Sequence, residues 1–520
     1  MAGKLEKYAL LNVADRTGII ELAYELRALN FQIISSGATA KALKQAEIEI
    51  IELTDLIGAK NILQGPLNLL HPQILSSLTL NPDPDKPGIA AELERQGGHP
   101  INLIAVNFYP VSEIVSDKNL TPREILDYID LTGPTLVRAA ARNYQNVLCL
   151  CDPEDYLPTI ESLKQYGRIH PDKKQSLAAK AFHYSAYYDS TVAQYLGGKW
   201  DRLPDELVIG LKKSADLHYG ENPQQQGALY ALSGARPWGL NAAQIIHGKP
   251  LSYNHYLDLD VAWELAIEIE DPACIIVRHA TPAGVASSEN LTEAARLAYR
   301  SDLRGCFQGS CAVNREINEE AAAFFAEAHI ALIAAPQFSP AALSILRAKK
   351  DIRLVTLPST LVSPAEMDIK TVAGGALIQD KDHSKMTGPF TCVTRRTPNE
   401  VETKSLQLAW HVAKHARTHA AVIVQGTSTI GIGSGQTSRL DSVRLALVKS
   451  QERHPILPPH TSLMMASDGV LSSEHVREAA QGGVGAMIQP GGSSEDKDAI
   501  EAANEKNIAM LFTGSRHFRH

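Results

Sequence analysis

Cysteine is scarce in this sequence of 520 residues, and it lacks the spacings of metal sites and redox pairs. No Cys-X-X-Cys motif occurs. Most of the cysteines lie in apolar, strand-like segments, and the six are Cys149, Cys151, Cys274, Cys306, Cys311 and Cys392. This pattern predicts buried free thiols in a reducing cytoplasm. The His-X-Glu and Pro-Cys-X-X-Cys motifs of zinc deaminases are also absent, so we predict no metal site.

Long apolar runs and an excess of positive charge are lacking as well. No apolar run approaches the ~18 residues of a membrane span, and none precedes Asp15-Arg16, so we expect neither a membrane segment nor a signal peptide. The net charge of −8 disfavours a general binder of nucleic acid or of membrane surfaces. The length predicts two to four domains, because single cores rarely grow beyond ~250–300 residues.

Strand-like and helical patterns alternate in the first part of the chain. The predicted strands are Tyr8–Val13, Phe31–Ile34, Ile48–Ile51, Leu103–Val106 and Val147–Cys151. A helical pattern separates the first two strands. Another helix is predicted to start at Thr121-Pro122-Arg123-Glu124, with Thr as the N-cap and Glu at the third helical position. Such alternation predicts an α/β fold with a mostly parallel sheet that is covered on both faces.

A glycine-rich and proline-containing segment, Tyr195–Pro204, predicts the main domain boundary. Strands are then predicted at Ala273–Val277, Ala331–Ala334, Ala420–Val424, Ala486–Ile488 and Ala509–Phe512. Ile275–Gly284 and Val422–Gly435 are weakly alike, because each joins an apolar strand to a turn with glycine. This likeness predicts two related α/β subdomains, divided near Leu357–Asp368.

The strand Ala273–Val277 ends in Arg278-His279, just before a predicted turn at Thr281–Gly284. A cation and an imidazole at the carboxyl end of a strand lie where open α/β sheets bind ligands. The alternative is a strand that ends in two polar surface residues. The residues alone leave both interpretations open.

Two further segments have the composition of ligand sites. The loop Ser35–Thr39 follows a strand and opens a helix, so its backbone N–H groups and hydroxyls could bind phosphate, although polar turns of this kind are common. Asp130 precedes a predicted helix that begins at Pro134 and carries Arg138 and Arg142 on one face. These groups could converge with Tyr109, or the helix could simply form ion pairs at the surface.

Two other classes of site have little support. The segment Gly431–Gly435 lacks the Gly-X-Gly-X-X-Gly spacing and a downstream acid, so we do not expect a nicotinamide cofactor. A Cys-His hydrolase is disfavoured because no cysteine lies in an exposed, electropositive turn.

These segments together resemble the bifunctional purine biosynthesis family, which joins aminoimidazole carboxamide ribonucleotide (AICAR) formyltransferase to inosine monophosphate (IMP) cyclohydrolase. The matching motifs span the chain: Val13–Gly18, Leu70-His71-Pro72, Asn107–Pro110, Ile129–Asn143, Tyr219–Pro223, Leu251–Asn254, Val277–Gly284, Val372–Gly375, Gly431–Arg439, Met465–Asp468, Gln489–Ser493 and Arg516–His520. So many matches in the same order identify the chain as a member.

The resemblance implies a methylglyoxal-synthase-like cyclohydrolase domain over residues 1–197. It further implies two cytidine-deaminase-like formyltransferase subdomains without zinc, over residues 198–360 and 361–520. It implies formyl transfer from 10-formyltetrahydrofolate to AICAR, followed by ring closure of the formylated product (FAICAR) to IMP. The protein is then expected to be a cytoplasmic homodimer with transferase sites across the interface and with no nucleic-acid or membrane partner.

The resemblance also implies the site residues. His279 is the expected base of formyl transfer and Arg278 its cationic neighbour, since the reaction needs a base for the amine and a donor for the oxyanion. Tyr109 and Asp130 match positions for ring closure, and Arg142 and His419 complete the expected catalytic set. The expected substrate-binding residues are Arg16, Ser35, Ser36, Gly37, Thr39, Asn68, His218, Tyr219, Asn222, Phe307, Gly375, Arg439, Arg516, Phe518 and His520.

Several of these positions depart from the family pattern. Asn68, Arg142 and Arg278 each stand where the family has lysine, His218 stands in place of an arginine, and His419 in place of an asparagine. Two hypotheses therefore stay open. One is a working bifunctional enzyme. The other is a catalytically impaired paralogue that binds nucleotide or folate or partners an active copy, with the cyclohydrolase half more affected because Asn68 carries no charge.

Overall fold

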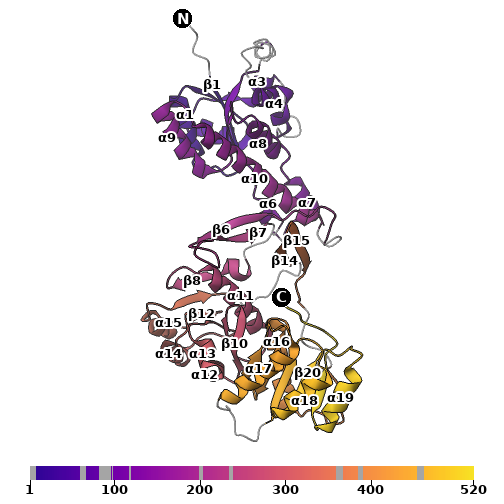
Figure 1. The fold of residues 1–520 in the computed structure, drawn as a ribbon. Coiled ribbons are helices and arrows are strands. Elements are labelled where there is room, and N and C mark those ends of the chain that lie inside the picture. The colour runs from indigo at the N-terminus through magenta and orange to yellow at the C-terminus, as the bar shows by residue number, and fades with distance from the viewer. Residues whose placement is uncertain are drawn as a thin grey trace. The chain divides into compact units, whose positions relative to one another are not determined.

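The computed structural model describes residues 7–58, 66–80, 95, 98–115, 117, 119–197, 203–233, 238–358, 367–383, 390–453 and 462–520. The chain divides into two compact units (Figure 1). Unit 1 comprises Met1–Lys212 with Tyr230–Arg236, and unit 2 comprises Lys213–Leu229 with Pro237–His520. Part of the predicted boundary at Tyr195–Pro204, residues 198–202, lies outside the described residues, as do residues 359–366 of the predicted division between the subdomains.

Unit 1 is built on a parallel sheet of order β3-β2-β1-β4-β5. Its strands are β1 (Lys7–Val13), β2 (Phe31–Ser35), β3 (Ile51–Glu52), β4 (Ile101–Asn107) and β5 (Leu148–Leu150). Its helices are α1 (Ile19–Ala28), α2 (Gly37–Gln45), α3 (Leu53–Ile57), α4 (Pro72–Thr79), α6 (Val111–Ile114), α7 (Pro122–Asp127), α8 (Thr132–Arg142), α9 (Tyr156–Tyr166) and α10 (Pro171–Gly197), with 3-10 turns η1 (Pro66–Leu70) and η2 (Pro153–Asp155).

Helices cover both faces of this sheet, as the alternation of patterns predicts. Ala9 and Leu11 of β1 pack with α1 and α9 in one buried cluster. Tyr8 and Leu10 point to the opposite face and pack with residues of α8 and α10 in a second cluster. Figure 1 labels β1 and these helices. Because successive side chains of a strand point to opposite faces, one apolar strand contributes to both cores.

Most of the local predictions for unit 1 are confirmed, and two are wrong in detail. The capping box of Thr121 and Glu124 forms as predicted at the start of α7. Of the strand predicted at Ile48–Ile51, only Ile51 belongs to a strand, β3. Ile48 lies before this strand and is buried in the core. The helix predicted to begin at Pro134 begins at Thr132, since the Asp130 side chain accepts hydrogen bonds from the backbone of Thr132 and Gly133.

Unit 2 contains a mixed sheet of order β16-β21-β20-β19-β17-β18-β10-β9-β11-β12-β13-β8. The first half consists of β8 (Gln244–His247), α11 (Tyr253–Glu268), β9 (Ala273–Arg278), β10 (Thr281–Ser287), α12 (Leu291–Ser301), α13 (Leu303–Cys306), β11 (Ser310–Val313), α14 (Glu319–Glu327), β12 (Leu332–Ala335), α15 (Pro340–Arg347) and β13 (Arg353–Thr356). The second half consists of β16 (Thr391–Cys392), α16 (Glu400–His415), β17 (Ala421–Gln425), β18 (Ser428–Gly433), α17 (Arg439–Glu452), β19 (Leu463–Ser467), α18 (Ser473–Gln481), β20 (Val484–Gln489), α19 (Asp496–Glu505) and β21 (Ala509–Phe512).

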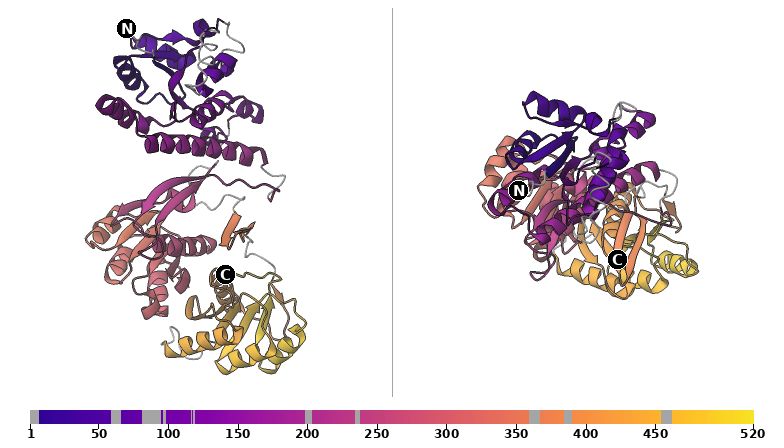
Figure 2. Two further views of the ribbon diagram at one scale, coloured as in Figure 1. Left: turned by 45° about the horizontal axis from the view of Figure 1, so that its top comes forward. Right: turned by 90° about the horizontal axis from the view of Figure 1, so that it is seen from above.

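The two halves of this sheet repeat one topology. In each half an antiparallel hairpin, β9–β10 or β17–β18, lies next to three strands that run parallel to one another. The halves join where β10 pairs with β18, with Ala286 opposite Ser428. Figure 2 shows the ribbon in two further views. A helix precedes each hairpin, α11 or α16, and packs in a common core with the inward residues of both hairpins.

The glycine turn predicted for the first hairpin is wrong, whereas the second hairpin does turn at a glycine, Gly426, whose φ is 59°. Two other glycines, within the strands, serve packing. Thr281–Gly284 belongs to strand β10, and the turn is formed by His279 and Ala280. A β-carbon added to Gly284 would lie 2.1 Å from the carbonyl oxygen of Ala298 in α12. Gly433 of β18 approaches Ser442 of α17 in the same way, at 1.9 Å. Glycine therefore lets a helix lie directly on each hairpin.

Two small hairpins complete the described structure. They are β6 (Leu211–Leu217) with β7 (Gly227–Leu232), and β14 (Met367–Val372) with β15 (Gly375–Asp380). A 3-10 turn, η3, spans Gly239–Ala242. Among the described residues no helix has the length and apolar character needed to cross a membrane.

We expect Gly433→Ala to lower the stability of unit 2 by about 2–3 kcal/mol, because β18 and α17 must move apart to admit the methyl group. Denaturant unfolding followed by circular dichroism measures the loss. Gly375→Ala is the matched control, since a β-carbon there has no atom within 4 Å. Equal stability of the two variants would contradict the packing role.

Candidate active sites

A pocket of about 530 Å³ in unit 1 brings together most of the residues predicted for ring closure. It lies where β1, β2 and β4 end. The predicted residues that line it are Arg16, Ser36, Gly37, Thr39, Asn68, Tyr109 and Asp130. They come from loops that are as much as 114 residues apart in sequence (130 − 16).

Two polar side chains tie the loops of this pocket together. Thr39 donates a hydrogen bond to the carbonyl of Val13 and accepts one from its N–H, at 3.1 and 3.0 Å. Asn107, at the end of β4, accepts hydrogen bonds from the N–H groups of Ala14 and Asp15 at 2.7 and 2.8 Å. Asn107 begins a motif that matches the family but is not among the predicted site residues, although its place after an apolar strand and before Tyr109 is a usable signal.

Asp130 joins the pocket to the first turn of α8. Its Oδ1 accepts hydrogen bonds from the N–H groups of Thr132 and Gly133 at 2.8 and 2.9 Å and from the Thr132 hydroxyl at 3.0 Å. A β-carbon on Gly133 would lie 2.5 Å from the Phe108 ring and 2.7 Å from Asp130 Oδ2. Only glycine therefore allows this close approach of α8 to the carboxylate.

Two tyrosines of α10 support the same pocket from behind. Tyr184 accepts a hydrogen bond from the N–H of Phe108 at 2.9 Å, and Tyr188 accepts one from the N–H of Asp130 at 2.7 Å. Burial, with the nearby acidic groups, raises the pKa of Tyr184 to about 12, so the hydroxyl stays neutral. The loops that carry Tyr109 and Asp130 are thus fixed by one helix.

The electrostatics of this pocket favour an anionic group near α2. The first turn of α2, Ser36 to Thr39, lines the pocket, and a helix N-terminus attracts negative charge. Arg16 is the only lysine or arginine among the described lining residues, because Asn68 is neutral. Ser35 is buried and donates to the Leu11 carbonyl at 2.8 Å, so it supports the loop from beneath.

Arg142 does not join this group. It is exposed at the end of α8 and is not among the described residues that line the pocket. Its helical neighbour Arg138 forms an ion pair with Asp189 of α10 at 3.0 Å. For Arg138, the surface ion-pair alternative therefore describes the structure.

A second pocket, of about 440 Å³, lies in unit 2. Ala280 of the β9–β10 turn lines it, together with residues of α11, the β14–β15 hairpin, the end of α16 and the C-terminal tail. Phe518 and His520 are the predicted site residues among its lining. The tail is held in place because the N–H of Thr418 donates to the Arg519 carbonyl at 2.8 Å and His517 pairs with Asp382 at 2.5 Å.

Arg278 and His279 lie at the tip of the β9–β10 hairpin, next to this second pocket. His279 is exposed and has a φ of 55°, and Ala280 has a φ of 53°. Two consecutive residues with positive φ form a two-residue hairpin turn that normally favours Asn-Gly. Arg278 donates a hydrogen bond to the carbonyl of Phe307 at 2.7 Å, which joins two predicted site residues.

His419 also has a left-handed backbone, with a φ of 58°. Its Nδ1 contacts the Gln436 carbonyl at 3.1 Å, and the next N–H, of Ala420, donates to Asp468 at 3.0 Å. Arg439 pairs with the same buried Asp468 and donates to Ser467 at 2.6 Å. Arg439 thus anchors this segment from beneath.

The remaining predicted residues lie apart from the second pocket. His218, Tyr219 and Asn222 belong to the loop after β6, where Asn222 donates to Gln225 at 3.0 Å. Gly375 lies in the turn of the exposed β14–β15 hairpin, and Arg516 is exposed near the end of the chain. The described residues do not gather these groups around His279.

A charged cluster that was not predicted from the sequence lies beside the second pocket. Glu268 of α11 contacts Lys414 at 2.6 Å, His415 at 3.0 Å and His411 at 3.6 Å. Burial alone would raise the pKa of Glu268, but the charge and hydrogen bond of His415, with the nearby His411 and Lys414, hold it well below its usual range. The His-X-X-Lys-His spacing on one helix face is the signal that could have indicated it.

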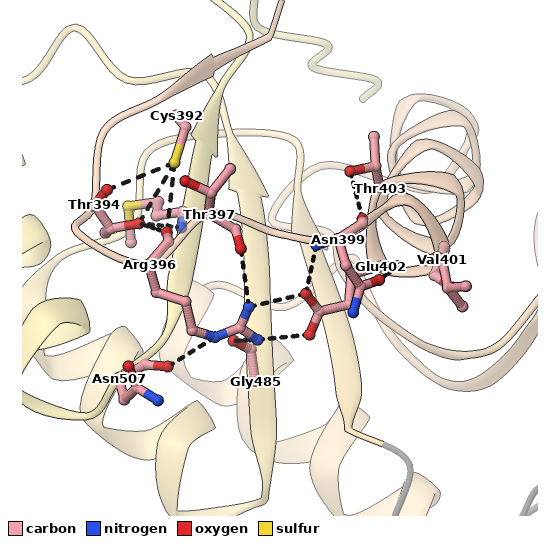
Figure 3. A network of polar contacts seen from close by, with 12 residues as sticks. Cys392, Thr394, Arg396, Thr397, Asn399, Val401, Glu402, Thr403, Gly485 and Asn507 are labelled. Carbon is pink, nitrogen blue, oxygen red and sulfur yellow. Dashed lines mark hydrogen bonds and ion pairs between the residues drawn. The ribbon is translucent and has the colours of Figure 1, made fainter.

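The start of α16 is anchored by a single arginine (Figure 3). Arg396 forms a bidentate pair with Glu402, at 2.5 and 2.8 Å, and donates to the carbonyls of Asn507 and Gly485, both at 3.1 Å. Glu402 also accepts from the N–H of Asn399, which completes the capping box of α16. The network connects α16, which carries Lys414 and His415 to the pocket, with β20 and the loop before β21.

Known proteins are similar in sequence to this chain along nearly its whole length. Residues 140–449 match the family described as the AICARFT/IMPCHase bienzyme, and residues 18–135 match an MGS-like domain. The first match covers more than half of the chain. The chain belongs to the AICARFT/IMPCHase bienzyme family.

Three curated relatives illustrate the similarity, and each is named the bifunctional purine biosynthesis protein PurH. The protein of Persephonella marina is 39% identical over 518 residues, covering 98% of this chain and 99% of its own. The protein of Anoxybacillus flavithermus is 37% identical, covering 99% and 100%. That of Bacillus subtilis is 36% identical, covering 99% of each chain. The family joins AICAR formyltransferase and IMP cyclohydrolase in one chain, and the parallel sheet of unit 1 belongs to its MGS-like domain.

We expect Arg396→Ala to destabilise unit 2 by about 2–3 kcal/mol, because Glu402 then keeps its charge without its partner in a largely buried place. Arg444→Ala is the matched control. Its pair with Glu478 is more exposed, so its loss should cost much less than the loss of the Arg396 pair. Denaturant unfolding of the two variants measures the difference, and similar losses would show that the Arg396 network is not an anchor.

We expect the stability of unit 2 to decrease as the pH is lowered, because His255 in the capping box of α11 becomes protonated. The N–H of Ser252 donates to its Nδ1 at 3.0 Å, and burial, with the charge of Arg353, lowers the pKa of His255 from 6.5 to about 4. Protonation therefore favours the unfolded chain, and stability is lost as the pH falls from 6.5 towards about 4.

The expected loss between about pH 7 and about pH 5 is on the order of 1–2 kcal/mol. His255→Gln keeps a capping side chain that does not titrate, so it should reduce this pH dependence. Thermal unfolding at the two pH values tests it. An unchanged dependence in the variant would assign the effect to other groups.

Proposed function

We propose that this chain catalyses both reactions of its family. In the first, the amine of AICAR attacks the formyl carbon of 10-formyltetrahydrofolate and tetrahydrofolate leaves. In the second, the carboxamide nitrogen of the formylated product attacks the same carbon, and loss of water yields IMP. The observation that carries the proposal is the pocket of unit 1, which gathers seven predicted residues in a chain related to the family over its full length.

For formyl transfer, we assign the base to His279 and the oxyanion donor to Arg278. The exposed imidazole can reach a bound substrate at the tip of its hairpin. One N–H of Arg278 is used by the Phe307 carbonyl, and a guanidinium carries five N–H donors, so others remain for a developing oxyanion. Arginine keeps its charge at all relevant pH values, which suits an electrostatic role better than proton transfer.

For ring closure, we assign Tyr109 and Asp130 to the reacting groups. The Tyr109 side chain is 56% exposed and lines the pocket with Asp130. Asp130 uses Oδ1 for the start of α8, and Oδ2 is the oxygen that can accept the carboxamide proton. The phosphate is assigned to Arg16 and the backbone N–H groups in the first turn of α2, while Thr39 supports that turn through its bonds to Val13.

The domain bounds, the assembly and the location belong to the same proposal. We assign cyclohydrolase activity to residues 1–197 and formyl transfer to two cytidine-deaminase-like subdomains, 198–360 and 361–520. A cytoplasmic homodimer is supported by the dispersal of the predicted transferase residues over unit 2, because a second copy would supply groups that one copy does not bring to His279. 10-Formyltetrahydrofolate is the proposed co-substrate.

The two activities are expected to separate by mutation. His279→Ala should lower formyl transfer by about 100-fold or more, because general-base catalysis contributes ~10²–10⁴-fold, and should leave closure of added FAICAR intact. Asp130→Asn should lower the rate at which FAICAR is closed and should leave formyl transfer intact. Tetrahydrofolate release and IMP formation are followed separately after mixing the protein with AICAR and 10-formyltetrahydrofolate.

The departures from the family pattern are tested in the same assay. Asn68→Lys restores a cation for the cyclohydrolase oxyanion, and Arg278→Lys restores the family pair. Tight binding of AICAR without either product in the unmodified protein would contradict the proposed function and would identify an impaired paralogue. If only one of the two substitutions raises the rate of its reaction, the defect of the unmodified protein lies in the half that catalyses that reaction.

A further inference from the structure

We propose that Asp258 of α11 is a positioning residue that fixes the turn carrying His279. The inference rests on the proposed role of His279 as the base. Asp258 does not reach substrate through this role. It acts through the backbone of Ala280, which follows the histidine.

The turn has a conformation that its sequence does not favour. His279 and Ala280 both have positive φ, at 55° and 53°, where side chains with a β-carbon are disfavoured. Most turns of this type contain glycine or asparagine at these positions. The surrounding structure must therefore hold the turn, because its own residues would favour another conformation.

Asp258 supplies the contact that holds it. Its Oδ1 accepts a hydrogen bond from the N–H of Ala280 at 2.7 Å, and its Oδ2 accepts one from the Ser310 hydroxyl at 3.3 Å. Ser310 is the first residue of β11, the neighbour of β9. The carboxylate thus connects the turn both to a helix and to the adjacent strand.

The helix that carries Asp258 is itself rigidly placed. Ser252 and His255 form the capping box at its start, and Leu259, next to Asp258, is buried in the core shared by the two halves. Arg278 is fixed at the same time by the carbonyl of Phe307. The backbone segment that carries His279 is therefore held by contacts of the residues on both sides of it.

The charge of Asp258 suits this place. Burial raises its pKa, while the hydrogen bonds from Ala280 and Ser310 and the nearby His279 and Arg278 oppose that shift. A carboxylate accepts from a backbone N–H more strongly than a neutral amide does. Asparagine at this position would keep the acceptor and lose only the charge.

The second half of unit 2 uses the same device at another place. His419 has a φ of 58°, and the N–H of the following Ala420 donates to the Asp468 carboxylate at 3.0 Å. The two His-Ala pairs occupy different positions, one after β9 and one before β17. A left-handed histidine held through the next N–H therefore occurs twice, on different elements, which indicates a specific arrangement.

Three variants test the role of Asp258: Asp258→Ala removes the acceptor, Asp258→Asn keeps it, and Asp351→Ala, an exposed acid of unit 2, is the matched control. Hydrogen exchange of the peptide containing Ala280 reports on the turn. We expect about 10-fold faster exchange there in Asp258→Ala, with β9 still protected, and little change in Asp258→Asn. Uniformly faster exchange in both variants would overturn the proposal in favour of a general structural role.

Rates measured on the same proteins connect the turn with catalysis. We expect kcat of formyl transfer to fall about 30- to 100-fold in Asp258→Ala, with KM nearly unchanged, because a displacement of about 1 Å has this cost. Asp258→Asn should restore most of the rate. Closure of FAICAR in unit 1 is the internal control for a correctly folded chain.

The exchange and rate measurements separate the two claims. Suppose that the unmodified protein is inactive and that the Ala280 amide still exchanges faster in Asp258→Ala. This result would contradict the proposed function and would leave the role of Asp258 in the turn intact. An unchanged amide and an unchanged kcat in Asp258→Ala, with normal activity of the unmodified protein, would overturn the positioning role alone.

Discussion

The pairing of backbone groups in the two sheets is the constraint on which both candidate sites depend. In unit 1, β1 lies between β2 and β4, with Leu11 opposite Ser35 and Val13 opposite Asn107. Parallel strands end at one edge, so the segments that follow them meet there. A change of one residue in the pairing register would move the side chains of a strand to the opposite face of the sheet, and the residues that line the pocket would no longer meet.

In unit 2, hairpins position the candidate site residues. Two copies of one topology join through β10 and β18, and a helix lies closely on each hairpin because Gly284 and Gly433 have no β-carbon. This packing leaves the hairpin tip as the place where Arg278 and His279 emerge from a buried strand. The tip has no core of its own, so its shape depends on a few polar contacts.

The predictions from sequence succeeded where local chemistry decides the outcome. The strand at Ala509–Phe512 and the capping box of Thr121 and Glu124 were both predictable, because apolar period and capping groups are local properties. The turn at Thr281–Gly284 was predicted wrongly, since proline and glycine usually interrupt strands. Here Gly284 is needed for contact with Ala298 of α12, the helix that follows β10, and a strand or turn pattern does not reveal how that helix packs back on the strand.

The sequence by itself determined the α/β class, the buried strands and, through the motifs spread along its length, the family. Only the tertiary structure decided which of the predicted groups meet. It brought Tyr109 and Asp130 into one pocket, left Arg142 outside it and placed Arg439 in a buried ion pair. The reason is physical: propensity acts between neighbours in the chain, whereas the position of a side chain depends on register, helix packing and hydrogen bonds between distant segments.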